Sequence, residues 1–213
     1  DLGAYDAYLR GQNIWGRQGA IDPISLREAA LMFERATALD PEFTEAWIER
    51  ARISAYLYSV VEPSPSMRDT ARRAVLRATE LAPDRVGTHL ATGDFHALIT
   101  GDLQLARQHY EQGIALNPRD AELLSAAGFA KVSLGLWEEA LDDFRRARDL
   151  DPRSAQPAYR LGFTLLCLRR YAEADEAYTR GLAAVPTDLN LLQGHAMVFL
   201  AQGDLNGARA TLA

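Results

Sequence analysis

Four histidines are the residues in this chain best suited to proton transfer or metal binding: His89, His96, His109 and His195. His89 and His96 are seven residues apart, so on one helix they share a face but lie two turns from each other, too far to hold one ion together. Zinc sites usually pair histidines three to five residues apart or use cysteine pairs, and neither spacing occurs. We therefore expect no metal ion and no cofactor.

Other reactive groups do not assemble into a catalytic motif. The single cysteine, Cys167, cannot form an internal disulfide, and its place in the apolar run Leu161 to Leu168 predicts a buried structural thiol. The acidic pairs Glu138-Glu139 and Asp142-Asp143 point in different directions on a helix and are typical of a solvated face. Without a phosphate-binding glycine loop or a nucleophile elbow, the sequence indicates a protein that is not an enzyme.

Charge and hydropathy exclude two further classes of function. A net charge of −6 opposes binding to nucleic acid, which depends on clustered Lys and Arg. Two arginine clusters do occur, but acidic residues accompany them, so we expect solvated, ion-paired helix faces there: Arg72, Arg73, Arg77, Arg145, Arg146 and Arg148. The apolar run around Cys167 is eight residues long, too short to insert into a bilayer.

A repeat organises the whole chain. Prolines recur at intervals of 42, 35, 34 and 34 residues, at Pro41, Pro83, Pro118, Pro152 and Pro186. Before each proline stands a small residue, then a large apolar one four positions later, then another small one three later. These triplets are Ala29, Phe33, Ala36; Ala71, Val75, Ala78; Ala106, Tyr110, Gly113; Ala140, Phe144, Ala147; and Ala174, Tyr178, Gly181. Such spacing makes one stripe of an α-helix, and the proline ends the helix.

A second motif shares this period. Small residues that predict a close helix crossing stand at Gly11, Ala51, Gly93, Gly128, Gly162 and Ala196. Turn signals follow four of them, at Gly101-Asp102, Gly135-Leu136, Arg170-Tyr171 and Gly203-Asp204. Each period is thus a predicted helix-turn-helix unit, with a sixth copy beginning at Ala208 and Leu212.

The fourth unit, with Ala127-Gly128, Trp137, Ala140, Phe144, Ala147 and Pro152, resembles a tetratricopeptide repeat at nearly every signature position. The resemblance implies an all-α fold, an α-α superhelix in which helix pairs stack to bury their apolar faces. We expect one solenoid domain over 1–213 with five complete repeats and a truncated sixth: 4–41, 44–83, 86–118, 121–152, 155–186 and 189–213. Phe144 is predicted to lie between its own repeat and the next.

Two segments depart from the family pattern. The Pro- and Ser-rich stretch from Val60 to Ser66 predicts either long helices in the second unit or a protruding loop. A further insertion lies around Gly16 to Pro23.

The opening segment, residues 4–11 and 25–29, is similar to repeats joined to bacterial nucleotide cyclases, membrane-anchored transcription regulators and serine/threonine kinases. Because the chain starts at Asp1 without Met, we expect a piece of a larger bacterial signalling protein. That resemblance implies a cytoplasmic location, or a periplasmic one if the parent protein is anchored in a membrane.

In this family the first helices line the concave side, which implies a peptide-binding groove. The family register assigns to it Tyr8, Gln12, Trp15, Glu49, Arg52, Tyr56, Asp94, Ser125, Phe129, Tyr159, Arg160, Phe163, Gln193 and Met197. Aromatics among a few charges suit a peptide with apolar anchors. The Lys and Asn clamp of repeats that grip chaperone tails is absent, since the corresponding positions hold Tyr8, Gln12, Glu49, Gly87 and Ala91.

Two hypotheses follow. The first is a non-catalytic scaffold that binds a protein or peptide in the groove. The alternative is a regulatory or self-association module that controls an attached catalytic or DNA-binding domain. Weak homo-oligomerisation is then expected through residues Leu205 to Ala213, where no following repeat covers Leu212.

Overall fold

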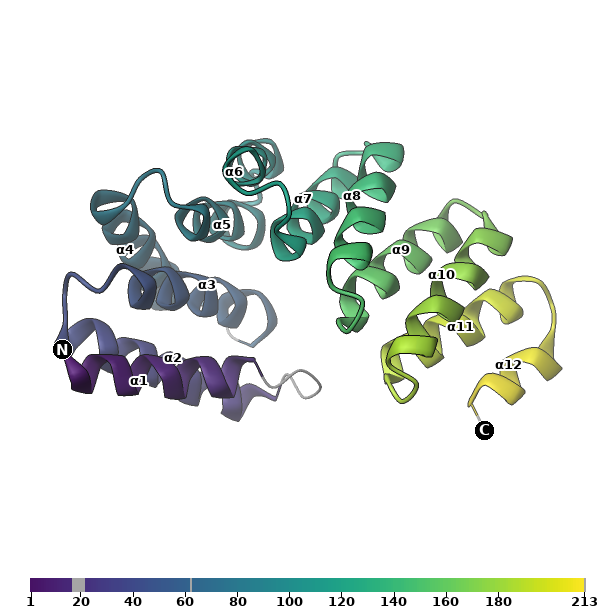
Figure 1. Cartoon of the computed structure of the whole chain (residues 1–213), viewed down its shortest axis with the longest axis horizontal. Helices are drawn as coiled ribbons and strands as arrows, with labels where there is room; N and C mark the ends of the chain where they lie inside the picture. The colour runs from purple at the N-terminus through teal and green to yellow at the C-terminus, as the bar shows by residue number, and fades with distance from the viewer. Residues whose placement is uncertain (17–21, 62, 213) are drawn as a thin grey trace. The chain divides into compact units, whose positions relative to one another are not determined.

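The computed structural model describes residues 1–16, 22–61 and 63–212, and all the regular structure in these ranges is helical (Figure 1). Its helices form two compact units, Asp1–Pro118 and Arg119–Ala213. In unit 1 they are α1 (Leu2–Trp15), α2 (Pro23–Leu39), α3 (Thr44–Val60), α4 (Pro65–Leu81), α5 (Val86–Phe95), the π-helical segment η1 (His96–Thr100) and α6 (Leu103–Leu116). In unit 2 they are α7 (Ala121–Ser133), α8 (Trp137–Leu150), α9 (Ala155–Cys167), α10 (Tyr171–Ala184), α11 (Leu189–Ala201) and α12 (Leu205–Leu212).

Within each unit the helices pack as successive pairs. The pairs are α1 with α2, α3 with α4 and α5 with α6 in unit 1, and α7 with α8, α9 with α10 and α11 with α12 in unit 2. First helices also contact the first helix of the next pair, as α3 does with α5 and α9 does with α11. The predicted all-α solenoid of helix-turn-helix repeats is confirmed, with a short sixth repeat. That both units form one domain stays a prediction.

Helix boundaries follow the predicted signals. α8 ends at Leu150 and α10 at Ala184, each two residues before its proline. At the other end, Asp120 caps α7 by accepting hydrogen bonds from the backbone N–H groups of Glu122 and Leu123. These local interactions satisfy amides that a helix leaves unpaired and help to set where each helix begins.

The turns inside the repeats also recur. Gly101, Gly135 and Gly203 have φ angles of 73°, 78° and 81°, a left-handed conformation that glycine adopts without steric cost. Arg169 occupies the same place in the fifth repeat, with φ 58°. At one of the four turns, therefore, a residue with a side chain adopts a backbone conformation that is unfavourable for it.

The large residue of each predicted triplet is buried, as expected. Phe33 and Tyr178 are fully buried, Phe144 is 1% exposed, and even Val75 is only 8% exposed. Phe144 belongs to a cluster that also contains Leu161 and Leu165 of the next repeat. The prediction that it packs between repeats is confirmed.

The structure describes part of each of the two segments that depart from the family pattern. The stretch around Val60 lengthens the second repeat's helices: α3 and α4 have 17 residues each, and only a short connection separates them. Glu62 of that stretch and residues 17–21 of the first insertion lie outside the described residues.

Cys167 is exposed, so the prediction of a buried thiol is wrong. The apolar run is amphipathic: Leu161 and Leu165 face the core, whereas Phe163 and Cys167, four residues apart, share the exposed face of α9. The prediction counted the apolar residues of the run without considering which side of the helix each one occupies.

No helix in the described part of the chain combines the length and the low polarity that crossing a membrane requires.

Candidate functional site

The predicted groove residues lie on first helices in both units, seven in each. In unit 1 they are Tyr8, Gln12 and Trp15 on α1, Glu49, Arg52 and Tyr56 on α3, and Asp94 on α5. In unit 2 they are Ser125 and Phe129 on α7, Tyr159, Arg160 and Phe163 on α9, and Gln193 and Met197 on α11. The two sets differ in the chemistry of their side chains.

Unit 2 repeats an exposed apolar residue once per first helix. Phe129, Phe163 and Met197 are 34 residues apart and are 40%, 42% and 48% exposed. Each directly follows the small residue at the helix crossing. One residue is about 100° of turn, so the crossing residue faces the core while its successor faces solvent. The repeat that buries the core therefore also exposes these anchors.

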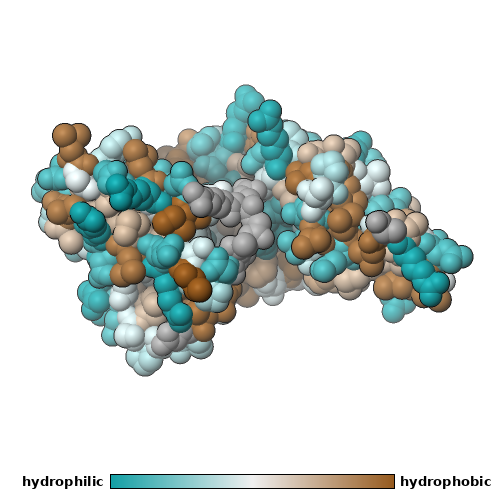
Figure 2. Space-filling model, turned by 90° about the horizontal axis from the view of Figure 1, so that it is seen from below, coloured by the Kyte–Doolittle hydropathy of each residue, from teal (hydrophilic) through white to brown (hydrophobic). Residues whose placement is uncertain are grey.

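A second apolar row lies one helical turn further along the same helices. Val132 and Leu166 are partly buried, and Leu200 is 51% exposed. We define the apolar strip as both rows together: Phe129, Val132, Phe163, Leu166, Met197 and Leu200. The predicted set missed the second row, although its own 34-residue spacing in the sequence could have revealed it. On the face drawn in Figure 2, hydrophobic side chains lie in several separate places among hydrophilic ones.

Polar and aromatic groups border the apolar strip. The Arg160 guanidinium lies over the Phe129 ring, 4.7 Å from its centroid, a cation–π contact. The Tyr159 and Phe163 rings stack with centroids 6.0 Å apart. The side chains of Gln156 and Gln193 are exposed. The flanks of the strip thus combine aromatic faces with amides that can donate and accept hydrogen bonds.

Ser125 departs from the expected placement. It is only 3% exposed, and its hydroxyl donates to Oε1 of Gln156 at 3.5 Å. Two residues of α7 after the buried Leu123, it lies in the contact with α9, where a groove ligand would not reach it. Its role here is packing between repeats.

In unit 1 the positions equivalent to Phe129 hold Gln12, Arg52 and Asp94. Arg52 Nε lies 3.2 Å from Asp94 Oδ2, and Arg52 Nη1 lies 3.4 Å from Glu49 Oε2. The Tyr110 hydroxyl donates to Asp94 Oδ1 at 2.9 Å. These charged side chains are only 11–18% exposed. The network therefore links α3 to α5 and α6 and presents little of its polar surface to a ligand.

The aromatics of unit 1 are similarly engaged with one another. Trp15 meets the Tyr56 ring edge-on at 5.4 Å, and Tyr8 packs against Phe43 at 5.0 Å. Gln12 Nε2 donates to the Tyr8 hydroxyl at 2.6 Å. Burial, with the nearby Glu49 carboxylate, raises the pKa of Tyr8 to about 12. This face is half-buried and polar where that of unit 2 is exposed and apolar.

The histidines form a cluster that their spacing did not predict. His109 on α6 lies near both histidines of the preceding segment, with ring centroids 6.0 Å from His89 and 5.8 Å from His96. Burial, then His96 and His89, lower the pKa of His109. Within 1–16, 22–61 and 63–212, no three His, Cys, Asp or Glu side chains are arranged to hold a metal ion.

The remaining histidine belongs to unit 2, and an open hollow in unit 1 has none of the clustered histidines in its lining. His195 Nε2 lies 2.7 Å from Asp175 Oδ1 on α10. The hollow, of about 600 Å³, lies along α1 and α2, lined by Leu9, Arg10, Asn13, Ile14, Glu28, Leu31 and Met32. None of the predicted groove residues lines it.

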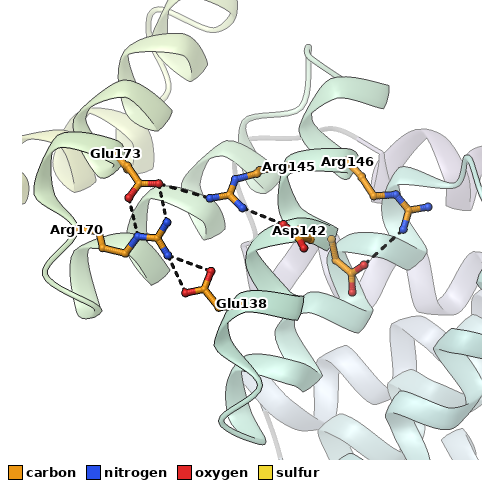
Figure 3. A network of polar contacts seen from close by, with 7 residues as sticks. Glu138, Asp142, Arg145, Arg146, Arg170 and Glu173 are labelled. Carbon is orange, nitrogen blue, oxygen red and sulfur yellow. Dashed lines mark hydrogen bonds and ion pairs between the residues drawn. The ribbon is translucent and has the colours of Figure 1, made fainter.

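The arginine cluster on α8 forms the expected ion-paired face (Figure 3). Arg145 lies 2.9 Å from Asp142 and 3.6 Å from Glu173, and Arg170 lies 2.8 Å from Glu138 and 2.6 Å from Glu173. Hydrogen bonds from Arg170 lower the pKa of the Glu173 carboxyl. These partly exposed pairs link α8 to the start of α10.

Comparison with known proteins agrees with this architecture. No protein-family model matches the chain. It is 34% identical over 102 residues to tetratricopeptide repeat protein 28 of Homo sapiens, covering 48% of this chain and 4% of that protein. It is 37% identical over 89 residues to Hsp70-Hsp90 organizing protein 1 of Glycine max, covering 42% of this chain and 16% of that protein. The chain therefore spans only a small part of these relatives.

Solved structures extend the likeness to nearly the full chain. A thermophilic tetratricopeptide-repeat protein of Thermus thermophilus has a TM-score of 0.77 at 20% identity, over 92% of this chain and 99% of that one. YrrB, described as a tetratricopeptide-repeat protein with an unusual peptide-binding site, has a TM-score of 0.56 at 17% identity, over 86% and 90%. The helix pairs of this chain have the fold of tetratricopeptide repeats and are similar to them in sequence.

Proposed function

We propose that this chain is a non-catalytic scaffold that binds a peptide or a segment of a partner protein on the apolar strip of unit 2. The observation that carries the proposal is the recurrence of a large, 40–48% exposed apolar side chain at one position of three successive first helices. Scattered surface apolar residues need no explanation, whereas a periodic row of them marks an interaction surface.

The energetics suit a partner of modest size. Fully burying a Phe or Met side chain is worth about 1.5–3 kcal/mol, so covering the exposed part of each anchor contributes about 1 kcal/mol. Aromatic anchors with a polar rim resemble the central residues of protein interfaces, and Tyr159 and Arg160 supply that rim. Gln193 is proposed to set the register of the bound segment on unit 2, and the groove residues of unit 1 are proposed as a separate contact surface.

The comparisons support a binding role in general terms. YrrB carries a peptide-binding site by its description, and the similar proteins are repeat proteins whose names include a chaperone organizer. The membership of this chain in a bacterial signalling protein, and its cytoplasmic or periplasmic location, are part of the proposal.

The alternative, self-association or regulation of an attached domain, has one observation in its favour. Leu205 and Leu212 on α12 are 61% and 59% exposed, on one side of the helix. A second copy or an attached domain could cover them. Light scattering over a range of concentrations tests this, since a mass that does not change with concentration contradicts self-association.

The leading proposal is tested by selecting short peptides from a random display library on the purified chain. Selected peptides should lose binding to the variant Tyr159→Ala/Phe163→Ala while its circular dichroism and melting temperature stay near those of the wild type. Equal loss of binding and folding would show that these residues are core, and unchanged binding would contradict the assigned surface.

A further inference from the structure

Where the two helices of a repeat pack, the same two positions carry different chemistry in different repeats. One position stands three residues after the small residue at the helix crossing, and the other directly precedes the large residue of the triplet. In the fourth repeat they hold Lys131 and Asp143, a buried ion pair with 2.6 Å between Nζ and Oδ2. In the fifth repeat they hold Leu165 and Ala177, which both belong to the apolar core.

The third repeat places two histidines at these positions. His96 follows Gly93 by three residues, and His109 precedes Tyr110. The two rings are 6° from parallel with centroids 5.8 Å apart, and the His89 ring lies 6.0 Å from that of His109. A contact that holds opposite charges or apolar groups in the next two repeats therefore holds groups that acquire like charges in acid.

An extra residue in the first helix accompanies the histidines. The turn residue Gly101 follows the crossing residue Gly93 by eight positions, whereas Gly135 follows Gly128 by seven. The π-helical segment η1, which begins at His96, accommodates the additional residue. Such segments occur mostly as single insertions within α-helices, often at functional sites. The insertion of the third repeat thus coincides with its histidine contact.

His109 is poorly placed to receive a proton. Its Nδ1 is buried and has no hydrogen-bond partner among the residues that the structure describes. An imidazolium carries N–H groups on both nitrogens, so one of them would be buried without an acceptor. Burial, with His96 and His89, lowers the pKa of His109. Protonation therefore weakens the contact between α6 and the helix formed by α5 and η1.

Charged groups on the same elements oppose this effect only in part. Asp102, which caps α6, raises the pKa of His96, but burial lowers it more. Arg107 and Glu111 flank His109 on α6 and are paired with each other, Nη1 to Oε1, at 3.3 Å. A positive charge on His109 thus arises beside a carboxylate that an arginine already holds.

The other helices packed against α5 and η1 bring paired charges or apolar groups. Arg52 of α3 lies 3.2 Å from Asp94 and 3.4 Å from Glu49, so these carboxylates have a partner other than the histidines. The residues that α4 adds to the core around Phe95 and Ile99 are apolar: Ala71, Ala74, Val75 and Ala78.

The helix that carries His109 also holds Asp94 in place. Tyr110 is the next residue on α6, and its hydroxyl donates to Asp94 Oδ1 at 2.9 Å. Asp94 in turn binds Arg52, which the family register assigns to the groove face of unit 1. A movement of α6 away from η1 therefore breaks the Tyr110 hydrogen bond and alters this polar face.

We propose that the contact between α6 and the α5–η1 helix is an acid-sensitive switch, in which like charges on His96 and His109 separate the two helices. Separation releases Asp94 from Tyr110. Because the closed form binds protons less readily than the open one, it is favoured above the ordinary pKa of histidine, about 6.5, and is lost progressively below it. The inference concerns unit 1 and stands apart from binding on the apolar strip.

Hydrogen exchange of the full chain at about pH 7.5 and about pH 5.5, read by mass spectrometry, tests the switch across the range in which histidine titrates. Rates are corrected for the pH dependence of intrinsic exchange. Peptides from 86–116, which span α5 to α6, should exchange several-fold faster in acid, and peptides from 121–201 should change much less. An equal change in both ranges, or none in 86–116, would overturn the inference.

One variant copies the contact of the fourth repeat. His109→Asp sets a carboxylate opposite His96, as Asp143 stands opposite Lys131. Protonated His96 then gains a partner of opposite charge, so acid should slow the exchange of 86–116 instead of speeding it. Exchange that still accelerates in acid as in the wild type would contradict the assigned pair.

A second variant copies the contact of the fifth repeat. His96→Leu/His109→Ala places there the residue types of Leu165 and Ala177, and most of the pH response of 86–116 should disappear. It also keeps the test decisive if His109→Asp does not fold. The matched control, His195→Gln in unit 2, should keep the wild-type response. A double variant that responds to acid like the wild type would overturn the inference.

The release of Asp94 is tested separately. Tyr110→Phe removes a hydrogen bond that only the closed form makes, so 86–116 should exchange several-fold faster at about pH 7.5. An unchanged rate would show that the helices open without breaking this bond, and would contradict the coupling to the polar face.

Discussion

The Phe144 ring on α8 lies so close to Gly128 on α7 that a Cβ added to Gly128 would be 2.6 Å from Cε1 of the ring. The same contact recurs between Gly11 and Phe33 and between Gly162 and Tyr178, at 2.7 Å in each case. The absence of a side chain on one helix is what lets the large ring of its partner reach the core. The two motifs of the repeat are therefore two halves of one contact.

This contact predicts that the effect of Gly128→Ala on the free energy of unfolding changes sign when the Phe144 ring is removed. Gly128→Ala should lower the free energy of unfolding by about 1–3 kcal/mol, because the ring of Phe144 must shift. In a Phe144→Ala background, itself destabilised by about 3–5 kcal/mol, the same change should stabilise by about 0.5–1 kcal/mol through helix propensity. Urea denaturation of the four proteins checks this, and additive effects would show that the residues do not touch.

Two tyrosines at the same repeat position should respond oppositely to loss of the hydroxyl. The Tyr178 hydroxyl is buried and makes no hydrogen bond to the described residues, so Tyr178→Phe should leave stability unchanged or raise it by about 1 kcal/mol. Tyr110→Phe removes a 2.9 Å hydrogen bond to Asp94 and should cost about 1.5–3 kcal/mol. Thermal denaturation of both variants compares them directly. A loss of stability in Tyr178→Phe would reveal a partner for its hydroxyl.

A buried ion pair in unit 2 should matter more than the exposed ones. Lys131 Nζ lies 2.6 Å from Asp143 Oδ2, with side chains only 10% and 7% exposed. Lys131→Met leaves that buried carboxylate without its lysine partner, beside Arg146 at 3.8 Å, and should cost about 3–5 kcal/mol. Arg145→Met, in the exposed network, should change stability by less than about 1 kcal/mol. Denaturation at low and high salt checks both, and similar costs would contradict the burial argument.

The histidine cluster should make unit 1 sensitive to acid. Burial lowers the pKa of His96 against the opposing effect of Asp102, and burial with His96 and His89 lowers that of His109. Because the unfolded chain then binds protons more readily than the folded one, stability present above about pH 6.5 is lost as the pH falls below it. His109→Gln should reduce the drop in melting temperature between about pH 7.5 and about pH 5.5. An unchanged drop would place the acid sensitivity elsewhere.

The turn at Arg169 offers a gain in stability. Its left-handed backbone costs about 1–2 kcal/mol for a residue with a side chain, and glycine removes this cost while adding about 0.5–1 kcal/mol of entropy loss on folding. Arg169→Gly should therefore stabilise by up to about 1 kcal/mol. Gly135→Ala, at the equivalent turn with φ 78°, should destabilise by a similar amount. Melting temperatures that shift in the same direction for both variants would contradict this reading.

The sequence by itself determined the class of fold, the repeat boundaries and the identity of the core positions. Local rules suffice for these features. Proline ends a helix wherever it stands, and a small–large–small stripe has to be buried against another helix, whichever helix that is. Phe144, Tyr178 and the proline-terminated helices could be read directly for this reason. The period also located the first helices, and with them Phe129, Phe163 and Met197.

Tertiary structure decided which of those residues present themselves to a partner. Ser125 is buried by α9, Arg52 and Asp94 are held to each other, and Cys167 turns away from the core, although sequence position alone treats each like its neighbours. His109 lies close to His89 and His96 because α5 and α6 pack antiparallel, which brings together residues that are far apart in the sequence. Burial and pairing depend on what the neighbouring helices bring to each position, which no local pattern contains.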